Sequence, residues 1–336
     1  MDSVTPIDVD RMVDALFIDG PVRGRKSSKF WILLLLSAVI ATAGVVADST
    51  ATVIGAMIVA PLMTPILGTA LAVVLADRRH VLRCVSLVVG GALVVIAIGF
   101  AVGLIDSPLD AYAANTQVTG RISPRLIDLL AALATGTVGA FALVRSDISD
   151  TLPGVAIAIS LVPPLAVVGL LVSVQRYSDA GGALLLFGTN VAAIIATGTA
   201  VLIGYRVRDA AREADYPIGQ LRGWTLTLVG AMVLVVAIPL GFGTLQVALD
   251  EQLAAQAKPL ADDWASSNKW VVTTLSARNG EVVITALGSP PDADVTTLRR
   301  VFNDNGLADA GLVVRLVLGG SATCSAGGSA CTLSTD

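Results

Sequence analysis

The chain has 336 residues, of which 54% are hydrophobic and 14% are charged. Soluble domains carry about 25% charged residues, and a soluble core cannot bury apolar runs as long and as frequent as these. The composition therefore excludes a soluble enzyme, a nucleic-acid-binding protein and a disordered scaffold, and it predicts an α-helical polytopic membrane protein. The net charge of −4 is spread thinly along the chain and indicates no class of partner.

Residues 1–29 are predicted to be a cytosolic amphipathic segment. Thr5-Pro6-Ile7-Asp8 combines a helix N-cap, a proline in the first turn and a partial capping box. Apolar residues then recur at helical spacing: Val9, Met12, Val13, Leu16 and Phe17. Such a helix packs on its own protein or lies on the membrane surface. The acidic residues of the segment favour packing, because anionic lipid would repel them.

Seven segments are long and apolar enough to be transmembrane helices, since a span needs about 20 mostly apolar residues. They cover residues 30–47, 51–76, 82–105, 127–144, 152–175, 182–204 and 224–243. Lys and Arg concentrate in the loops before the first segment, after the second and before the seventh, and such residues mark cytoplasmic loops. The sequence therefore predicts a plasma (inner) membrane protein with a cytoplasmic N-terminus and an extracytoplasmic C-terminal domain.

Two parts of the chain resemble each other at an offset of 99 residues. Gly55 and Pro65 align with Gly154 and Pro164, and the same shift aligns three predicted spans with the next three. An odd number of spans inverts the second copy, which gives a 3+3 inverted repeat like that of many secondary transporters. The predicted domains are repeat 1 (30–105), an extracytoplasmic loop (106–126), repeat 2 (127–205), a basic cytosolic loop (206–223), a seventh helix (224–243) and an extracytoplasmic α+β domain (244–336).

Prolines break one apolar segment in each repeat, Pro61 and Pro65 in the first and Pro163 and Pro164 in the second. Proline removes a backbone N–H and frees carbonyl groups, which cannot be left facing lipid. Helices that restart near residues 66 and 165 would present positive N-terminal ends. The breaks predict a binding site for a small anionic or neutral solute. The alternative is a pair of kinks healed by neighbouring Ser and Thr.

Uncharged polar residues near the breaks complete the predicted site. Thr64 lies beside the first break, Ser160 beside the second, and Asn190 is an amide well inside a later span. Hydrogen bonding between helices is the alternative role for Asn190.

Two carboxylates, Asp48 and Asp128, are predicted near the outer membrane boundary. Charges close to a span are candidates for function, so these two residues are candidates for a vestibule or a proton site. The alternative is ordinary contact with water at the interface, with Asp128 paired to Arg125.

Residues 244–336 are predicted to form a small α+β domain. A helical stretch at 245–268, interrupted at Pro259, precedes strands at 270–277 and 281–287, which Asn279-Gly280 joins as a hairpin. A helix at 292–305 and a strand at 312–318 complete the order α-β-β-α-β. This order resembles lipid-associated periplasmic domains at the level of the fold alone.

Cys324 and Cys331 bracket a short loop after the last predicted strand. An oxidising compartment favours a disulfide between them, and two free thiols are the alternative. Cys84, at the inner end of the third span, is predicted to be a small buried hydrophobe. No zinc site is expected, because the two C-terminal thiols lack His or further Cys partners.

Three motifs resemble one bacterial and archaeal membrane family. They are GAMIVAPLMTPILG at 55–68, LPGVAIAISLVPPLAVVG at 152–169 and LLLFGTNVAAI at 184–194. The family is the uncharacterised hydrophobic-domain family, domain of unknown function three-eight-nine, and the resemblance covers residues 48–205. It implies a membrane protein and carries no functional residue to this chain.

The leading hypothesis is a transporter or channel for a small solute, with the site between the two broken helices. The alternative is a membrane scaffold or lipid-handling protein that acts through residues 244–336. An enzyme is not expected, because the chain lacks a phosphate-binding loop and its lone His80 has no plausible nucleophile beside it. No cofactor or metal is expected. The expected partners are the lipid bilayer, a small solute or ion, and further copies of the chain in a homo-oligomer, but no nucleic acid.

Overall fold

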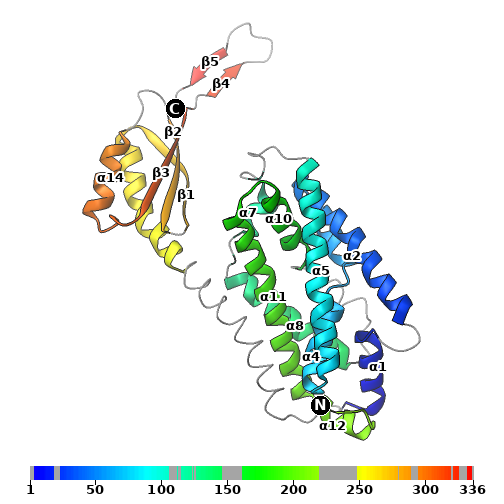
Figure 1. Ribbon diagram of the computed structural model, residues 1–336. Helices are drawn as coiled ribbons and strands as arrows, with labels where there is room; N and C mark the ends of the chain where they lie inside the picture. The colour runs from blue at the N-terminus through cyan, green and yellow to red at the C-terminus, as the bar shows by residue number, and fades with distance from the viewer. Residues whose placement is uncertain are drawn as a thin grey trace. The chain divides into compact units, whose positions relative to one another are not determined.

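The computed structural model describes residues 4–18, 23–105, 112, 115–122, 124, 126–145, 161–218, 248–278, 280–288, 294–318, 321–324 and 331–334. The chain divides into two compact units, Met1–Gly241 and Phe242–Asp336. The described part of the first unit is helical, whereas the second unit contains both helices and strands (Figure 1).

Four long helices of the first unit are apolar enough to cross a membrane: α2 (Arg23–Val46), α5 (Arg78–Ile105), α8 (Leu126–Val144) and α11 (Tyr177–Gly204). α3 (Thr50–Val59) and α4 (Met63–Val74) are bent by 47° at the short break between them, and together they could form a fifth span. The shorter helices are α1 (Pro6–Leu16), α7 (Thr116–Thr119), α10 (Val162–Ser173) and α12 (Val207–Glu213). The helical membrane class is therefore supported, but seven spans are not confirmed.

Three of the helices extend beyond the predicted spans. α2, α5 and α11 begin at Arg23, Arg78 and Tyr177, several residues before the apolar runs predicted at 30, 82 and 182. In α2 and α5 the added residues include Lys and Arg, which are good helix formers, so these two helices continue through their basic flanks. The predicted seventh span at 224–243 and the first half of the fifth lie outside the described residues.

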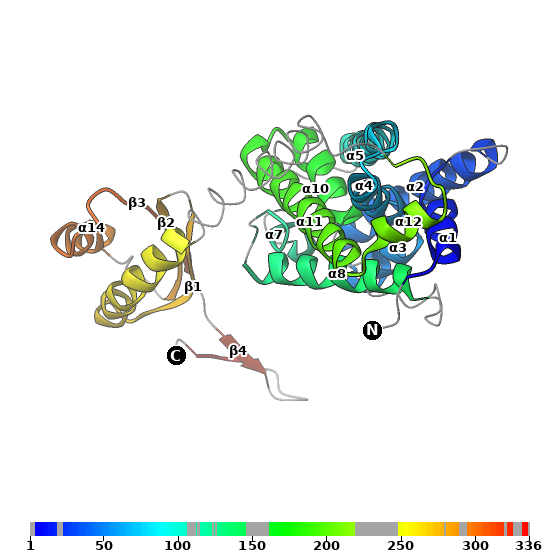
Figure 2. The ribbon, with the colours of Figure 1, turned by 90° about the horizontal axis from the view of Figure 1, so that it is seen from below.

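The two short helices α4 and α10 form the centre of the first unit. Residues 65–74 of α4 and 162–171 of α10 are all buried. Both helices contact α5 and α11, and in Figure 2 α4 is seen among α5, α8 and α11. A helix of 12 residues is about 18 Å long, which is roughly half the apolar thickness of a bilayer.

The described helices recur at the offset of 99 residues. α4 and α10 begin and end 99 residues apart, and so do α5 and α11. The residues after the short helices repeat as well, because Ala76 and Gln175 both have positive φ, 55° and 61°. Positive φ is uncommon for residues other than glycine, so the two copies share an unusual turn as well as helix lengths.

Each short helix packs against the long helix of the other copy. A Cβ atom at Gly99 of α5 would lie 2.5 Å from the Ala166 carbonyl oxygen of α10, and one at Gly169 would lie 2.3 Å from the Ile96 carbonyl oxygen. Gly198 occupies the position of Gly99 in α11. It lies against Leu67 and Ala70 of α4, which are the equivalents of Ala166 and Gly169. In each copy, the short helix therefore contacts the long helix of the other copy through equivalent residues.

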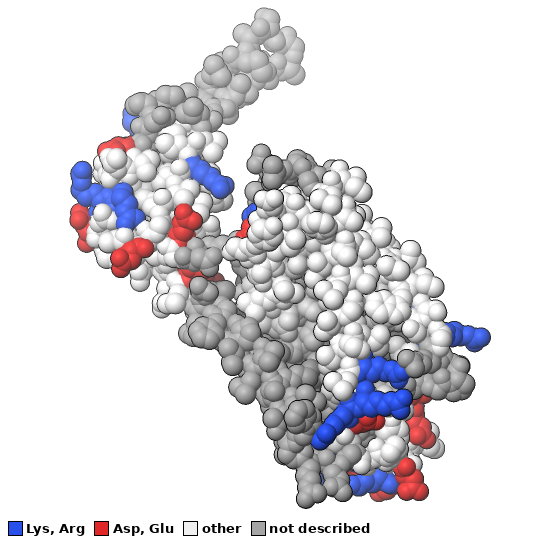
Figure 3. Space-filling model, viewed as in Figure 1, with Lys and Arg blue, Asp and Glu red and all other residues white. Residues whose placement is uncertain are grey.

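The long helices α5 and α11 run antiparallel. Arg208, just after α11, donates to the Val74 carbonyl at the end of α4, just before α5 begins. At the other end, Ser173 closes α10 just before α11 begins, and it lies against Gly103 near the end of α5. Figure 3 shows that the surface of the first unit is largely uncharged on this side, with charged side chains gathered at the end where α5 begins.

The N-terminal helix α1 packs on the first unit. Thr5 is its N-cap and forms the capping box with Asp8. Val9, Met12, Leu16 and Phe17 are buried. α1 contacts α4, α8 and α12, so it adopts the packing that the sequence favoured over a position on the membrane surface.

The second unit has the predicted order α-β-β-α-β. Residues 248–267 form a helix, followed by β1 (Trp270–Arg278), β2 (Glu281–Gly288), α14 (Val295–Asp304) and β3 (Gly311–Leu318). The sheet order is β1-β2-β3, with β1 antiparallel and β3 parallel to β2. Helix 248–267 and α14 lie on one side of the sheet (Figure 1), and Trp264, Ile284 and Phe302 lie in the core between them.

Two features of the second unit differ from the prediction. The helix runs through Pro259, which is exposed, so water can hydrogen-bond the carbonyl that proline leaves without a partner. A second, two-stranded sheet of β4 (Ser321–Cys324) and β5 (Cys331–Ser334) was not predicted. Short strands without a strong turn signal carry little pattern in sequence.

Candidate functional site

The first predicted break lies at Pro61. α3 ends at Val59, and α4 begins at Met63 with no side-chain cap from Leu62. Pro65 is not at the break but in the first turn of α4, where a missing N–H has little cost. Thr64 is half-buried in the same turn, and its backbone N–H donates to the Pro61 carbonyl (3.2 Å).

The second pair of prolines opens a helix. Pro163 and Pro164 follow Val162, the first residue of α10, and both are buried. Ser160 lies outside the described residues. Both short helices begin three residues earlier than the starts predicted near residues 66 and 165, because proline is compatible with the first helical turn.

The positions of the prolines weaken the predicted anion site. A helix N-terminus binds anions through its first backbone N–H groups, and proline has none. Pro163 and Pro164 therefore remove two of the donors of α10, and Pro65 removes one from α4. Leu62, Leu161 and Val162, at the starts of these helices, belong to one cluster of buried apolar residues.

Asn190 is fully buried near the middle of α11. The residue 99 positions earlier is Gly91, in the middle of α5, where a Cβ atom would lie 3.0 Å from Leu62 at the first break. Gly91 therefore faces the break in the first copy, and Asn190 occupies the equivalent position in the second copy. Its neighbour Thr189 donates to the Leu186 carbonyl within α11 (3.0 Å), as expected of a packing residue.

Asp48 anchors a neighbouring segment. It lies in the turn between α2 and α3 and accepts hydrogen bonds from the Thr116 hydroxyl (2.7 Å) and the Gln117 N–H (3.0 Å). The Thr116 hydrogen bond is the main cause that holds the pKa of Asp48 below its usual value. A carboxylate held in its ionised form is poorly suited to exchange protons near neutral pH.

Asp128 approaches the same segment through Arg121. Burial lowers the pKa of Arg121, and the negative charge of Asp128 opposes that shift. Arg121 also donates to the Gln117 carbonyl (2.6 Å). The predicted partner Arg125 lies outside the described side chains. Both carboxylates are thus linked to the segment at 115–122. Its polar residues Asn115, Gln117 and Arg121 were not selected from the sequence, although the run Asn115-Thr116-Gln117 between two apolar segments was a visible signal.

Cys324 and Cys331 are paired as Cα partners across β4 and β5, and the disulfide stays a prediction. Cys84 is a buried free thiol. Within the described part of the chain, His, Cys, Asp and Glu form no group of three or more that could hold a metal ion.

The central helices match the model of a known family. Residues 57–196 match the family model described as domain of unknown function DUF389. An uncharacterised protein of Methanocaldococcus jannaschii is 30% identical over 218 residues, which cover 62% of this chain and 66% of that protein. The match thus spans just under two thirds of the relative. No solved structure matches the chain.

The region that matches the DUF389 model contains both short helices. It extends from the end of α3 into the second half of α11, so it includes Pro61, Pro65, Pro163, Pro164 and Asn190. Helices α1 and α12 and the second unit lie outside it. The match agrees with the resemblance drawn from the three motifs, and the family has no assigned function.

Proposed function

We propose that this protein moves a small solute across the plasma membrane, without enzymatic chemistry, along a path between α4 and α10. The observation that supports this most is the exchanged packing of α4 on α11 and of α10 on α5, at positions 99 residues apart. Two antiparallel copies with short central helices are typical of secondary transporters with inverted repeats. On this proposal the chain has seven spans, a cytoplasmic N-terminus and a homo-oligomeric assembly.

The solute is neutral in preference to anionic. The prolines at the helix starts remove N–H donors, and the described residues of α4 and α10 include no charged side chain. Asn190 supplies a buried amide that can both donate and accept a hydrogen bond. These groups suit a small solute that itself both donates and accepts hydrogen bonds.

The test is flux into proteoliposomes that contain the purified protein, with urea and glycerol as neutral probes and phosphate as an anionic probe. Asn190→Leu should lower the flux about tenfold, the effect of losing one useful hydrogen bond. Thr137→Val is the matched control, because its hydroxyl is exposed on α8 and donates to the Leu133 carbonyl. Pro164→Ala should also lower the flux. Unchanged flux in both variants removes the proposed site, and no flux of any probe removes transport.

The second candidate function is lipid handling by the second unit. Val271, Leu287 and Val317 are 66%, 42% and 45% exposed. They are neighbours in one row across β1, β2 and β3, on the face opposite the buried Ile284. Residues 244–336 contain their own core, so the isolated domain can be tested by flotation with phospholipid vesicles. Absence of binding, or equal binding by Val271→Asp, would remove this candidate.

A further inference from the structure

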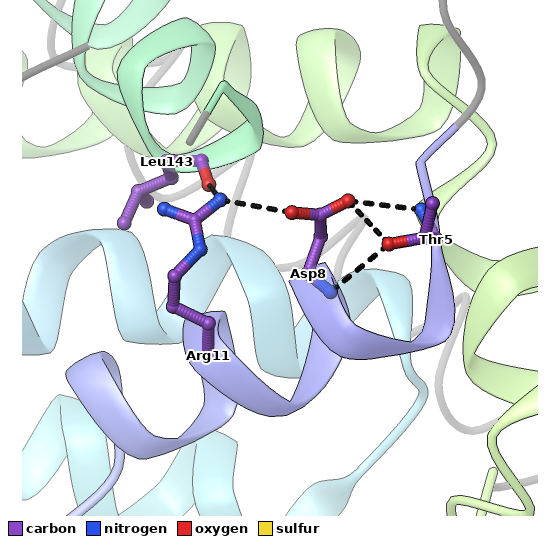
Figure 4. Close-up of polar contacts among 4 residues, drawn as sticks. All are labelled: Thr5, Asp8, Arg11 and Leu143. Atoms are coloured by element: carbon purple, nitrogen blue, oxygen red, sulfur yellow. Dashed lines mark hydrogen bonds and ion pairs between the residues drawn. The ribbon is translucent and has the colours of Figure 1, made fainter. Parts of the chain in front are cut away.

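Helix α1 covers one end of the first unit. Arg11 donates to the Leu143 carbonyl (3.1 Å), which lies at the C-terminal end of α8, and Asp8 holds the same guanidinium at 3.3 Å (Figure 4). The last carbonyls of a helix have no partner within the helix. α1 precedes the first copy in the chain. It therefore supplies a hydrogen bond to the end of α8, which is the first helix of the second copy.

Cys84 lies near the C-terminal end of α1. A Cβ atom at Gly68 of α4 would be 2.9 Å from the Cys84 sulfur and 3.4 Å from the Leu16 carbonyl oxygen of α1. One turn before Cys84, His80 stacks on Phe17 with ring centroids 4.0 Å apart. The thiol is 3% exposed, so it is a native reporter of whether α1 stays in place.

A second segment occupies the equivalent place at the opposite end. This outer segment consists of Tyr112 and residues 115–122. Asn115 donates to the Val45 carbonyl (2.7 Å) at the C-terminal end of α2, and α2 is the counterpart of α8 in the other copy. A Cβ atom at Gly182 of α11 would lie 1.9 Å from the Ile122 carbonyl oxygen. Ala183, the residue 99 positions after Cys84, is fully buried in the cluster that contains Tyr112 and Ile122.

We propose that α1 and the outer segment are the inner and outer gates of the solute path. α1 precedes the first copy in the chain and contacts α8, the first helix of the second copy. The outer segment precedes the second copy and contacts α2, the first helix of the first copy. Each gate therefore contacts the other copy, as α4 and α10 do. The structure describes the state with both gates closed. Either gate opens by releasing the carbonyl at the helix end, which water can then hydrogen-bond. This inference rests on the proposed transport function.

The inner gate is tested by the rate at which N-ethylmaleimide labels Cys84. Purified full-length protein in proteoliposomes carries Cys324→Ser and Cys331→Ser, so that Cys84 is the remaining thiol. Arg11→Met or His80→Ala should raise the labelling rate on the order of tenfold, since each removes one contact that holds α1. Asp10→Asn is the matched control, because Asp10 is exposed on the same helix. Rates equal to that of the control in both variants would overturn the inner gate.

The outer gate is tested with the thiol introduced by Ala183→Cys in a Cys84→Ser, Cys324→Ser, Cys331→Ser background. Asp48→Ala removes the hydrogen bonds from Thr116 and Gln117 and should raise the labelling rate about tenfold. Tyr177→Phe is the control, since Tyr177 is exposed at the same end of α11. If the starting protein does not fold, Thr116→Val and a shift in protease cleavage of the outer segment replace this measurement. Equal rates, or equal cleavage, would overturn the outer gate.

Flux measured in the same variants separates the two proposals. Faster labelling together with altered flux supports both the gates and transport. Solute flux in the unaltered protein with no change in labelling overturns the gates and leaves transport in place. Faster labelling with no flux of urea, glycerol or phosphate overturns transport, and with it the assignment of these segments as gates of a solute path.

Discussion

Two glycines set how closely α5 and α10 can cross. Gly99 and Gly169 face each other's helix backbone, and a Cβ atom at Gly169 would lie 2.3 Å from the Ile96 carbonyl oxygen and 2.6 Å from the Phe100 nitrogen. Backbone atoms cannot move aside as the end of a side chain can. Small residues at such crossings let helices in membranes pack by close contact, so this pair is where the two copies depend on each other most.

Gly169→Ala is therefore expected to destabilise the first unit by about 1–3 kcal/mol, the usual cost of overpacking. The measurement is the thermal unfolding midpoint of the purified protein in detergent. Gly188→Ala is the matched control, because Gly188 lies in α11 with no atom within 4 Å of its would-be Cβ, and alanine favours helix. The control should unfold at the same or a higher temperature. Equal midpoints for Gly169→Ala and the unaltered protein would contradict the close crossing.

At the scale of the element, the distinctive features of the helices lie at their ends more than in their interiors. α4 and α10 have equal lengths and end at equivalent turns, and each begins beside prolines that fit a first turn. α1 begins with a complete capping box, and α14 begins with Asp294 as its N-cap. These ends are local features, and the capping box of α1 was visible in sequence. The residues that hydrogen-bond the helix ends, Arg11 at Leu143 and Asn115 at Val45, were not visible in sequence.

The cap of α14 gives the second unit a specific dependence on pH. Hydrogen bonds from Thr296 and Thr297 lower the pKa of Asp294 to about 2, from an ordinary value of 3.8. Because the folded pKa is depressed, the ionised cap stabilises the fold above about pH 4, and this contribution is lost as the pH falls towards 2. Chemical denaturation of residues 244–336 between pH 2 and 5 measures the effect.

Asp294→Asn is the matched variant for this prediction. Asparagine is an equally good N-cap but does not titrate, so the variant should lose the part of the pH dependence that belongs to Asp294. A pH dependence as steep in the variant as in the unaltered domain would assign the effect to another carboxyl group.

At the scale of the whole molecule, the two units differ in the physics that holds them. The first unit exposes large apolar side chains along its long helices, such as Leu93 and Leu104 of α5, which suits contact with lipid. The second unit buries its apolar residues between a sheet and two helices, as a soluble domain does. The two units therefore differ in where they place their apolar side chains.

We expect the second unit to be extracytoplasmic. In intact cells expressing a Cys84→Ser variant, a membrane-impermeant maleimide should label Cys324 and Cys331, and labelling should require prior reduction if the disulfide forms. Labelling that needs the membrane to be opened would place this domain in the cytoplasm. An even number of spans would then replace seven, and the inverted topology proposed for the two copies would have to be revised.

The sequence by itself determined the membrane class, the offset of 99 residues, the break at Pro61, the cap of α1 and the order of the α+β domain. The offset follows from comparing the chain with itself, and the others follow from composition or from residues close together in the chain. The tertiary structure decided that Pro163 and Pro164 lie in the first turn of a helix, that the copies exchange partners, and that Asp48 holds the outer segment. The exchanged contacts and the contacts of Asp48 join residues 67 to 131 positions apart, and the apolar sequences that bring such residues together are too alike to specify which helix meets which.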